Sequence, residues 1–279
     1  MTGVQTCALP IYWADAPPLP ARDKPARGEL LLDVDAVRKE FGGLVAVNDV
    51  SFAIRSGDIV GLIGPNGAGK STTFNLITGV LGLTRGDVRF RGASVAGLPS
   101  REIARRGMSR TFQHVKMVPE MTVLENVALG GYLRTRSGTL RAMLRLDRME
   151  ERSLFKEAEA QLARIGMARQ MHELAGNLAL GPQRLMEIAR ALCTDPSLLL
   201  LDEPAAGLRH NEKQALAGVL RQLKAEGLSI LLVEHDMDFV MGLTDRIVVM
   251  EFGTRLIEGT PDEVQASPQV RAAYLGTEH

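Results

Sequence analysis

The chain has 279 residues with 33 basic and 33 acidic side chains, so its formal net charge is zero, and only 4% of its residues are aromatic. This composition offers neither a basic surface for a phosphate backbone nor a platform of rings for base stacking, which argues against a nucleic-acid-binding protein. The length allows a large core, most simply in one domain that carries a subdomain. No uninterrupted apolar run approaches the ~20 residues needed to cross a bilayer, so any membrane role should be peripheral.

The first 28 residues differ from the rest of the chain. Residues 1–11 read as the translation of a sequencing adapter joined to the open reading frame, and we exclude them from the fold prediction. Residues 12–28 are rich in Pro, Ala and charge without an apolar period. We therefore expect residues 1–28 to be a disordered lead-in in which Trp13 is not a core residue, and residues 29–279 to form the folded domain.

From residue 29 onward, short runs typical of strands alternate with longer runs typical of helices, as in an α/β sheet covered by helices. Residues 30–37, 46–54 and 88–91 read as strands, and they predict an antiparallel layer in the N-terminal part. The apolar run at residues 59–63 is a further strand, and it leads directly into the most specific motif of the chain.

That motif is Gly-Pro-Asn-Gly-Ala-Gly-Lys-Ser-Thr at residues 64–72. Its glycines let backbone N–H groups converge on phosphate oxygens at a helix start, while Lys70 reaches the β and γ phosphates and the Ser71 hydroxyl can ligate Mg²⁺. A glycine-rich turn that matches by chance is a poor alternative, because strand, lysine and serine are all in register. The predicted nucleotide-binding residues of the loop are Gly64, Asn66, Gly67, Ala68, Gly69, Lys70, Ser71 and Thr72.

The middle of the chain predicts helices. Between residues 122 and 191 the sequence is dominated by Ala, Leu, Met, Glu and Arg, with few β-branched residues. We interpret residues 114–195, approximately, as a helical subdomain inserted in the sheet domain. The elements predicted after it are strands at residues 198–202, 230–234 and 247–250 and a helix at residues 211–225.

Polar side chains stand where predicted strands end. Asp202 and Glu203 follow four leucines, and a buried strand has no reason to end in two acids unless they face a polar site. Asp202 is placed to hold Mg²⁺, through water, and Glu203 to act as general base for an attacking water. In a purely structural alternative, both acids cap the following turn.

His235 and Gln113 repeat this pattern at two other strand ends. An imidazole at the position of His235 can form a hydrogen bond to the γ-phosphate or to the attacking water. The other histidines are interpreted as ordinary surface or packed residues. A neutral amide at Gln113 can sense both Mg²⁺ and the γ-phosphate without adding charge. Gln113 alone would be weak evidence.

In order and spacing, these motifs resemble an ABC-transporter ATPase. The resemblance covers residues 30–276, and it includes Phe41, the phosphate loop, Gln113, residues 178–184, Asp202, Glu203, residues 205–208 and His235. Residues 41–47, 110–113, 202–208, 234–237 and 273–276 look most like the branched-chain amino-acid importer subfamily, in particular its longer, LivG-type ATPase. The resemblance implies a P-loop NTPase fold: a RecA-like core sheet with helices on both faces, an N-terminal antiparallel β layer and an inserted α-helical subdomain.

The resemblance also implies roles for residues that carry no clear signal alone. Phe41 would stack on adenine, although a core phenylalanine is an equal alternative, and Gln113 would couple the nucleotide site to a permease loop. Two ATPase subunits would pack head to tail, each closing the nucleotide of the other with the signature at a helix start. The signature residues expected at the nucleotide are Ala179, Gly181 and Gln183.

The signature departs from the superfamily form Leu-Ser-Gly-Gly-Gln. Ala179 replaces the serine and removes one hydroxyl donor to the γ-phosphate of the partner, while Pro182 replaces the glutamine after glycine. A lost hydrogen bond to a charged group costs about 1.5–3 kcal/mol, so the composite site that uses this signature is expected to be the weaker one. We expect Pro182 at the first helical position, where its missing N–H would have no intrahelical partner.

We therefore predict an ATP-hydrolysing subunit, with ATP and Mg²⁺ as cofactors, on the cytoplasmic face of the inner membrane. It would energise an importer for branched-chain or other hydrophobic amino acids. The implied partners are two permease subunits, a second ATPase subunit in a homo- or heterodimer and, indirectly, a periplasmic solute-binding protein, with no nucleic acid. Met117, Val118 and Met121 are candidates for the permease contact, with a place in the subdomain core as an equal alternative.

The sequence leaves four other functions open. Within the class, the ATPase could serve a urea or amide importer or a lipopolysaccharide exporter. The altered signature also allows a nucleotide-gated binding module with little turnover, against which Glu203 and His235 argue. A soluble ABC protein of DNA repair or translation fits poorly, because the chain has a single cassette and a neutral charge.

Overall fold

The computed structural model describes residues 13–111, 116–135 and 148–275. Gln113 and the adapter-like residues 1–11 lie outside these ranges. Within the described ranges, no helix combines the length and the apolar character needed to cross a bilayer.

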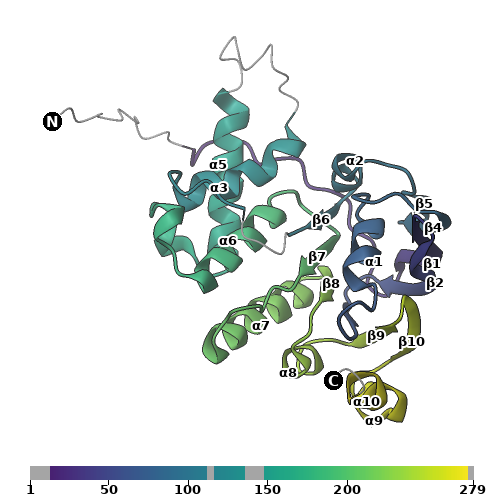
Figure 1. The fold of residues 1–279 in the computed structure, drawn as a ribbon. Helices are drawn as coiled ribbons and strands as arrows, with labels where there is room; N and C mark the ends of the chain where they lie inside the picture. The colour runs from purple at the N-terminus through teal and green to yellow at the C-terminus, as the bar shows by residue number, and fades with distance from the viewer. Residues whose placement is uncertain (1–12, 112–115, 136–147, 276–279) are drawn as a thin grey trace.

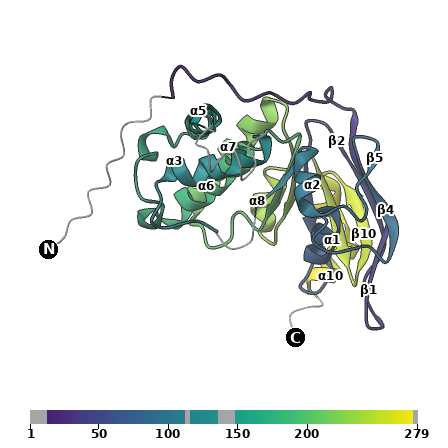
Figure 2. The ribbon, with the colours of Figure 1, turned by 90° about the horizontal axis from the view of Figure 1, so that it is seen from above.

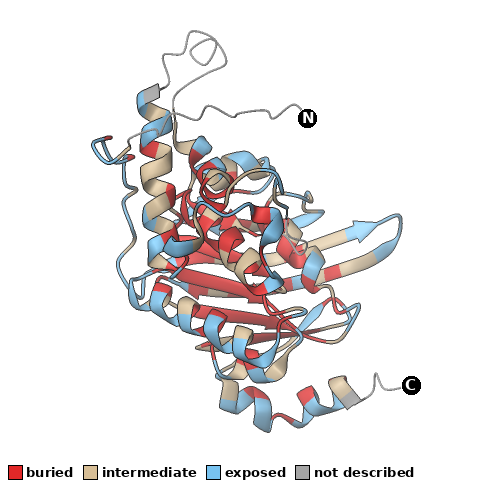
Figure 3. Ribbon diagram, turned by 90° about the vertical axis from the view of Figure 1, so that its left-hand side faces the viewer, coloured by how far each residue is buried: buried red, intermediate tan, exposed pale blue. Residues whose placement is uncertain are grey.

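A six-stranded sheet forms the centre of the molecule, in the order β10-β9-β3-β8-β7-β6 (Figure 1). The strands are β3 (Ile59–Ile63), β6 (Met108–Arg110), β7 (Leu198–Asp202), β8 (Ser229–Val233), β9 (Arg246–Glu251) and β10 (Thr254–Gly259). All neighbouring pairs are parallel except β9 with β10. Every residue of β3, β7 and β8 is buried, which explains their unbroken apolar sequences (Figure 3).

A second sheet is antiparallel, in the order β2-β1-β4-β5. Its strands are β1 (Leu30–Phe41), β2 (Leu44–Arg55), β4 (Arg85–Phe90) and β5 (Ala93–Ser94). Helix α1 (Lys70–Ile77) contacts β1 and β2 of this sheet and β8 of the central one, and its Phe74 and Ile77 are buried in the core cluster that the two sheets share. The predicted antiparallel layer is thus confirmed, and it holds the helix that follows the phosphate loop.

The predicted helical insertion lies between β6 and β7, at the end of the molecule opposite the antiparallel sheet (Figure 2). Its elements are α3 (Val123–Ala128), η1 (Leu129–Arg134), α5 (Arg148–Arg164), η2 (Ala168–Gln170), η3 (Ala175–Asn177) and α6 (Leu180–Leu192). Pro182 was expected at the first position of its helix, but it is the third residue of α6. It is tolerated there because the N–H groups of the whole first turn have no intrahelical partner.

The remaining helices flank the central sheet. They are α2 (Ser100–Arg105), α7 (His210–Ala225), α8 (Met237–Met241), α9 (Pro261–Ala266) and α10 (Pro268–Leu275). Helix α7 matches the prediction to within one residue and buries Leu216, Leu220 and Leu223 as its apolar stripe. The sequence did not predict β10, α9 or α10.

Residues 13–28, which we call the N-terminal strap, are ordered against the rest of the chain, so the expectation of a disordered lead-in is wrong for this part. The Trp13 ring stacks on Phe155 of α5 with centroids 5.5 Å apart, and its indole N–H donates to the Glu159 carboxylate. Lys156 donates to the carbonyl oxygens of Ala14 and Ala16 at 3.0 and 2.7 Å. Trp13 is therefore packed on the core, contrary to prediction.

The other end of the strap is held by charge. The Asp195 carboxylate accepts from the backbone N–H of Arg22 and from the Lys24 ammonium, both at 2.6 Å. The Arg22 guanidinium reaches the Thr194 carbonyl, and Arg91 of the antiparallel layer donates to the Asp23 carbonyl. The composition of the strap could not predict these contacts, because the partner residues lie far from the strap in the sequence.

Trp13 is the only tryptophan of the chain, so its fluorescence reports on the strap directly. Because the ring is stacked and partly buried, we expect acrylamide to quench its emission several-fold less than that of a free indole. Phe155→Ala should remove the stacking partner and raise the quenching constant, whereas Tyr132→Ala, at an exposed aromatic, should leave it unchanged. Free-indole quenching in the unmodified protein would show that the strap is not packed in solution.

Candidate functional site

The phosphate loop is built from backbone conformations that only glycine adopts easily. Gly64 and Gly69 have φ angles of 151° and 93°, and Gly69 is the residue that precedes the first turn of α1. A Cβ at Gly64 would lie 2.1 Å from the Met250 carbonyl oxygen, and a Cβ at Gly69 would lie 2.7 Å from that of Ala46. The loop is therefore packed between β9 and β2. It stands at the start of a helix, as the motif predicted.

A cavity of about 460 Å³ opens over this loop. It is lined by Leu44, Val45, Ala46, Asn66, Gly67, Ala68, Gly69, Lys70, Ser71, Thr72, Glu203, Phe252 and Gly253. The Lys70 ammonium donates to the Gly64 and Pro65 carbonyl oxygens at 2.6 and 2.9 Å. Burial lowers the pKa of Lys70, and the Glu203 carboxylate opposes this shift. The cavity thus combines a lysine, backbone N–H donors at a helix start and one acid.

Glu203 enters the cavity from the end of β7 in a strained backbone conformation. Its φ of 47° is unusual for a residue with a side chain, and its N–H donates to the Val233 carbonyl oxygen at 2.9 Å. Strain of this kind costs of order 1–3 kcal/mol and concentrates at functional sites. The His235 Nδ1 atom lies 4.0 Å from the Glu203 Oε1 atom, so the two strand ends deliver an acid and an imidazole to the same place.

A second acid, Glu234, ties these two strand ends together. Its carboxylate is buried and accepts from the N–H groups of Ala205, at 2.7 Å, and His235, at 3.2 Å. Burial raises the pKa of Glu234, and these two hydrogen bonds act against that shift. No role was predicted for Glu234 from the sequence. Like Asp202, however, it is an acid at the end of a buried strand, and this position was the reason for predicting a role for Asp202.

Asp202 is buried beside Glu203 and pairs with a residue that sequence reasoning also passed over. The Arg110 guanidinium lies 3.7 Å from the Asp202 carboxylate. It also donates to the Asn75 side chain of α1 at 2.9 Å and to the hydroxyl of Thr78, the residue after α1, at 2.8 Å. Burial raises the pKa of Asp202. The positive charge of Arg110 lowers this pKa, and the negative charge of Glu203 raises it further. The arginine thereby helps to keep a charged carboxylate in a buried position.

The other predicted site residues lie apart from this cavity. Phe41 is 45% exposed at the end of β1 and stands outside the cavity lining, where Leu44, Val45 and Phe252 supply the apolar surface. Ala179, Gly181 and Gln183 lie at the start of α6, also outside the lining. Gln113 falls outside the described residues. The structure therefore brings the phosphate loop, Asp202, Glu203 and His235 together.

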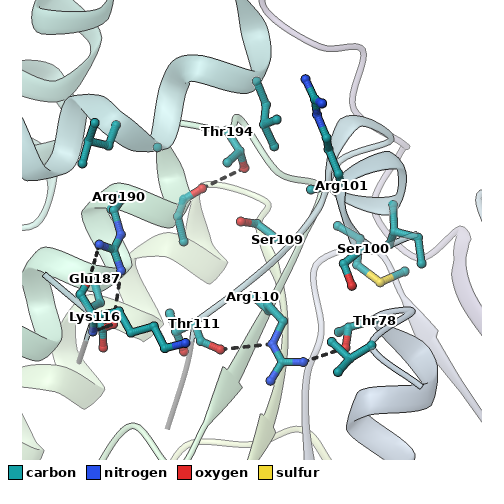
Figure 4. Close-up of a pocket in the computed structure, with 18 residues that line it drawn as sticks. Thr78, Ser100, Arg101, Ser109, Arg110, Thr111, Lys116, Glu187, Arg190 and Thr194 are labelled. Atoms are coloured by element: carbon teal, nitrogen blue, oxygen red, sulfur yellow. Dashed lines mark hydrogen bonds and ion pairs between the residues drawn. The ribbon is translucent and has the colours of Figure 1, made fainter. Parts of the chain in front are cut away.

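A second cavity, also of about 460 Å³, separates α2 and β6 from η1 and α6 (Figure 4). Its lining carries the cations Arg101, Arg110, Lys116 and Arg190 and the acid Glu187. Glu187 is buried and lies 3.3 Å from Arg190. Cations thus dominate the charge of this cleft between the sheet and the helical insertion.

Comparison with known proteins agrees with this geometry. Residues 47–206 match the family model described as ABC transporter. This chain belongs to the ABC transporter ATP-binding family. Residues 258–279 match a second model, described as branched-chain amino acid ATP-binding cassette transporter.

Individual relatives agree with the family. The chain is 45% identical over 249 residues to the high-affinity branched-chain amino acid transport ATP-binding protein LivG of Salmonella typhimurium, covering 88% of this chain and 98% of that protein. The corresponding protein BraF of Pseudomonas aeruginosa is 40% identical over the same length. A crystal structure of the ADP conformation of MJ1267, an ATP-binding cassette of an ABC transporter, superimposes with a TM-score of 0.79 at 32% identity, covering 89% of this chain and 99% of that one. The predicted P-loop NTPase fold and the predicted family are confirmed.

Proposed function

We propose that this chain is the ATP-hydrolysing subunit of an importer for branched-chain amino acids, bound to the cytoplasmic face of the membrane through its permease. One observation carries the proposal: Lys70 and Glu203 line one cavity, and His235 stands 4.0 Å from Glu203. The substrate class rests on the LivG and BraF relatives and on the C-terminal family model. A urea, amide or lipopolysaccharide transporter has no comparable support in these findings.

Each side chain at the cavity has a task in this reaction. The loop N–H groups and Lys70 bind the β and γ phosphates, because both place positive charge where negative charge accumulates. Glu203 accepts a proton from the attacking water as general base. His235, 60% exposed beside Glu203, is free to hydrogen-bond the γ-phosphate or that water.

The donors at this site suit Mg²⁺. Ser71 offers a hydroxyl in the cavity lining, and Asp202 offers a carboxylate at the adjoining strand end, so both present the oxygen atoms that a hard cation prefers. Among the described residues, no cluster of three or more His, Cys, Asp and Glu side chains is arranged to bind a metal without a nucleotide. Bound Mg²⁺ would neutralise charge that develops on the transferred phosphoryl group.

The start of α6 is suited to a second ATPase subunit. Ala179 and Leu180 are exposed there, and Gln183 is held by a 2.8 Å hydrogen bond to the Leu178 carbonyl oxygen. A helix start that faces outward can direct its N–H groups at the γ-phosphate bound by a neighbouring copy or by a related ATPase. Because Ala179 lacks a hydroxyl, this contact depends on backbone donors.

We propose that the permease contacts the loop that precedes α3. Val118 is 40% exposed, and its backbone N–H and carbonyl groups both bond to the buried Asn126 side chain, at 2.8 and 3.0 Å. The loop is thus held rigidly at the edge of the helical insertion, next to Lys116 of the cationic cleft. Met117 instead packs partly on the core, and Met121 lines a smaller cavity beside α5, so Val118 is the best placed of the three.

The catalytic proposal is tested with Glu203→Gln. In the assembled complex we expect release of phosphate to fall by about 100-fold or more, because the general base is lost, while ATP binding is retained. Phosphate release and nucleotide affinity should be measured side by side, with Glu151→Gln in the exposed first turn of α5 as the control. Equal hydrolysis by Glu203→Gln and the unmodified protein would instead favour a nucleotide-gated module with little turnover.

The docking proposal is tested with Val118→Asp. A buried charge at the contact should abolish stimulation of hydrolysis by the permease and substrate, yet leave ATP affinity unchanged. Val118→Thr, which keeps the shape without adding charge, should behave nearly like the unmodified protein. Unimpaired transport by Val118→Asp would remove Val118 from the contact.

A further inference from the structure

The cationic cleft between the sheet and the helical insertion contains a buried acid, Glu187 of α6, that has no role in the site described so far. Glu187 is 3% exposed, and its carboxylate accepts a hydrogen bond from the backbone N–H of Lys116 at 3.0 Å. The Arg190 guanidinium, on the same helix, donates to the carbonyl oxygen of Lys116 (Figure 4). Two side chains of α6 therefore hold both backbone polar groups of one residue in the loop that precedes α3.

Buried charge fixes this clamp between α6 and the loop. Arg190 lies 3.3 Å from the Glu187 carboxylate, and Arg184, one turn earlier on α6, lies 3.7 Å from it. Burial raises the pKa of Glu187, and the hydrogen bond from Lys116 and the two arginines act against this shift. Separating one partner from a buried ion pair leaves the other charge uncompensated, so these side chains favour a single arrangement.

The clamped residue lies between two surfaces that the proposed function gives to partners. Val118, two residues after Lys116, is the proposed permease contact, and Asn126 fixes its backbone to α3. The N-cap of α6 is Ala179, at the surface proposed for the second ATPase subunit. Packed side chains and rigid helices can carry a displacement from one site to another. A movement of the loop at Lys116 would thus reach the start of α6 through Glu187.

We propose that Glu187 is a positioning residue for ATP hydrolysis: it joins the permease-contact loop to α6, so that docking of the permease sets the position of the helix start offered to the second subunit. The inference rests on the proposed function, because it concerns how that hydrolysis is stimulated. The phosphate-loop cavity is lined by other residues. A change at Glu187 should therefore alter stimulation and leave ATP affinity as it is.

The test is Glu187→Gln in the assembled complex, with leucine as the transported solute. The amide oxygen can still accept from the Lys116 N–H, but the charge that holds Arg184 and Arg190 is lost. Coupling between two sites is typically worth about 5- to 150-fold, and we expect the ratio of leucine-stimulated to unstimulated hydrolysis to fall by about 5-fold or more. The KM for ATP should not change. Because it is a ratio, this readout does not depend on the fraction of the protein that is folded.

Two further variants complete the experiment. Glu157→Gln is the matched control, because Glu157 is an acid of α5 that pairs with Arg134 of η1, at 3.3 Å, and it should keep the full ratio. If Glu187→Gln does not fold, Arg190→Lys tests the clamp from its other side. A single ammonium cannot reproduce the guanidinium fork that contacts both Glu187 and the Lys116 carbonyl oxygen, so the ratio should fall here too.

An unchanged ratio in folded Glu187→Gln, or in Arg190→Lys if the first variant does not fold, would overturn the inference, because the clamp would then serve packing alone. An equal fall in Glu157→Gln would also overturn it, since any altered acid of the helical insertion would then have the same effect. A rise in the KM for ATP that accounts for the lower ratio would contradict it by assigning Glu187 to nucleotide binding. Absence of leucine stimulation in the unmodified complex would instead overturn the proposed function itself.

Discussion

The parallel pairing of β8 with both β3 and β7 is the constraint on which the site depends. Leu62 and Asp202 are both in register with Val233, so the three strands end at one level of the sheet. The residues that follow, the phosphate loop after β3, Glu203 after β7 and His235 after β8, must therefore meet at one edge. A shift of one residue in either pairing would turn the side chains to opposite faces and separate the lysine from its acids.

This arrangement buries several charged side chains, and removing them from water costs folding free energy. Lys70, Asp202 and Glu234 are all buried. Burial lowers the pKa of Lys70 and raises the pKa of Asp202 and of Glu234, so it favours the neutral form of each group. Partners reduce the cost, since Arg110 faces Asp202 and two backbone N–H groups bind Glu234. Together with the strained φ of Glu203, these buried charges lower stability at the strand ends, as expected for the phosphate chemistry proposed there.

Local sequence signals predicted the parts of the molecule whose chemistry is carried by neighbouring residues. The phosphate loop, the buried strands and the acids at their ends could be predicted because each combines a strand, a turn and a polar side chain within about ten residues. Partners that meet only in the fold could not be predicted. Examples are the Arg110–Asp202 pair, the hydrogen bond from the Ala205 N–H to the Glu234 carboxylate, and the packing of Trp13, a strap residue, on α5. Phe41, for which adenine stacking and a place in the core had been equal alternatives, lies outside the cavity lining, where the turn between β1 and β2 places Leu44.

The central claim is that Glu203 and His235 act on one phosphoryl group held by Lys70. When two groups act on one reacting atom, the effects of removing them on kcat are not additive. The most direct measurement is therefore kcat for Glu203→Gln, for His235→Ala and for the double variant in the assembled complex. The account predicts that the double variant is about as slow as the slower single variant. Losses that multiply, so that the double variant is slower by the product of the two single effects, would contradict it.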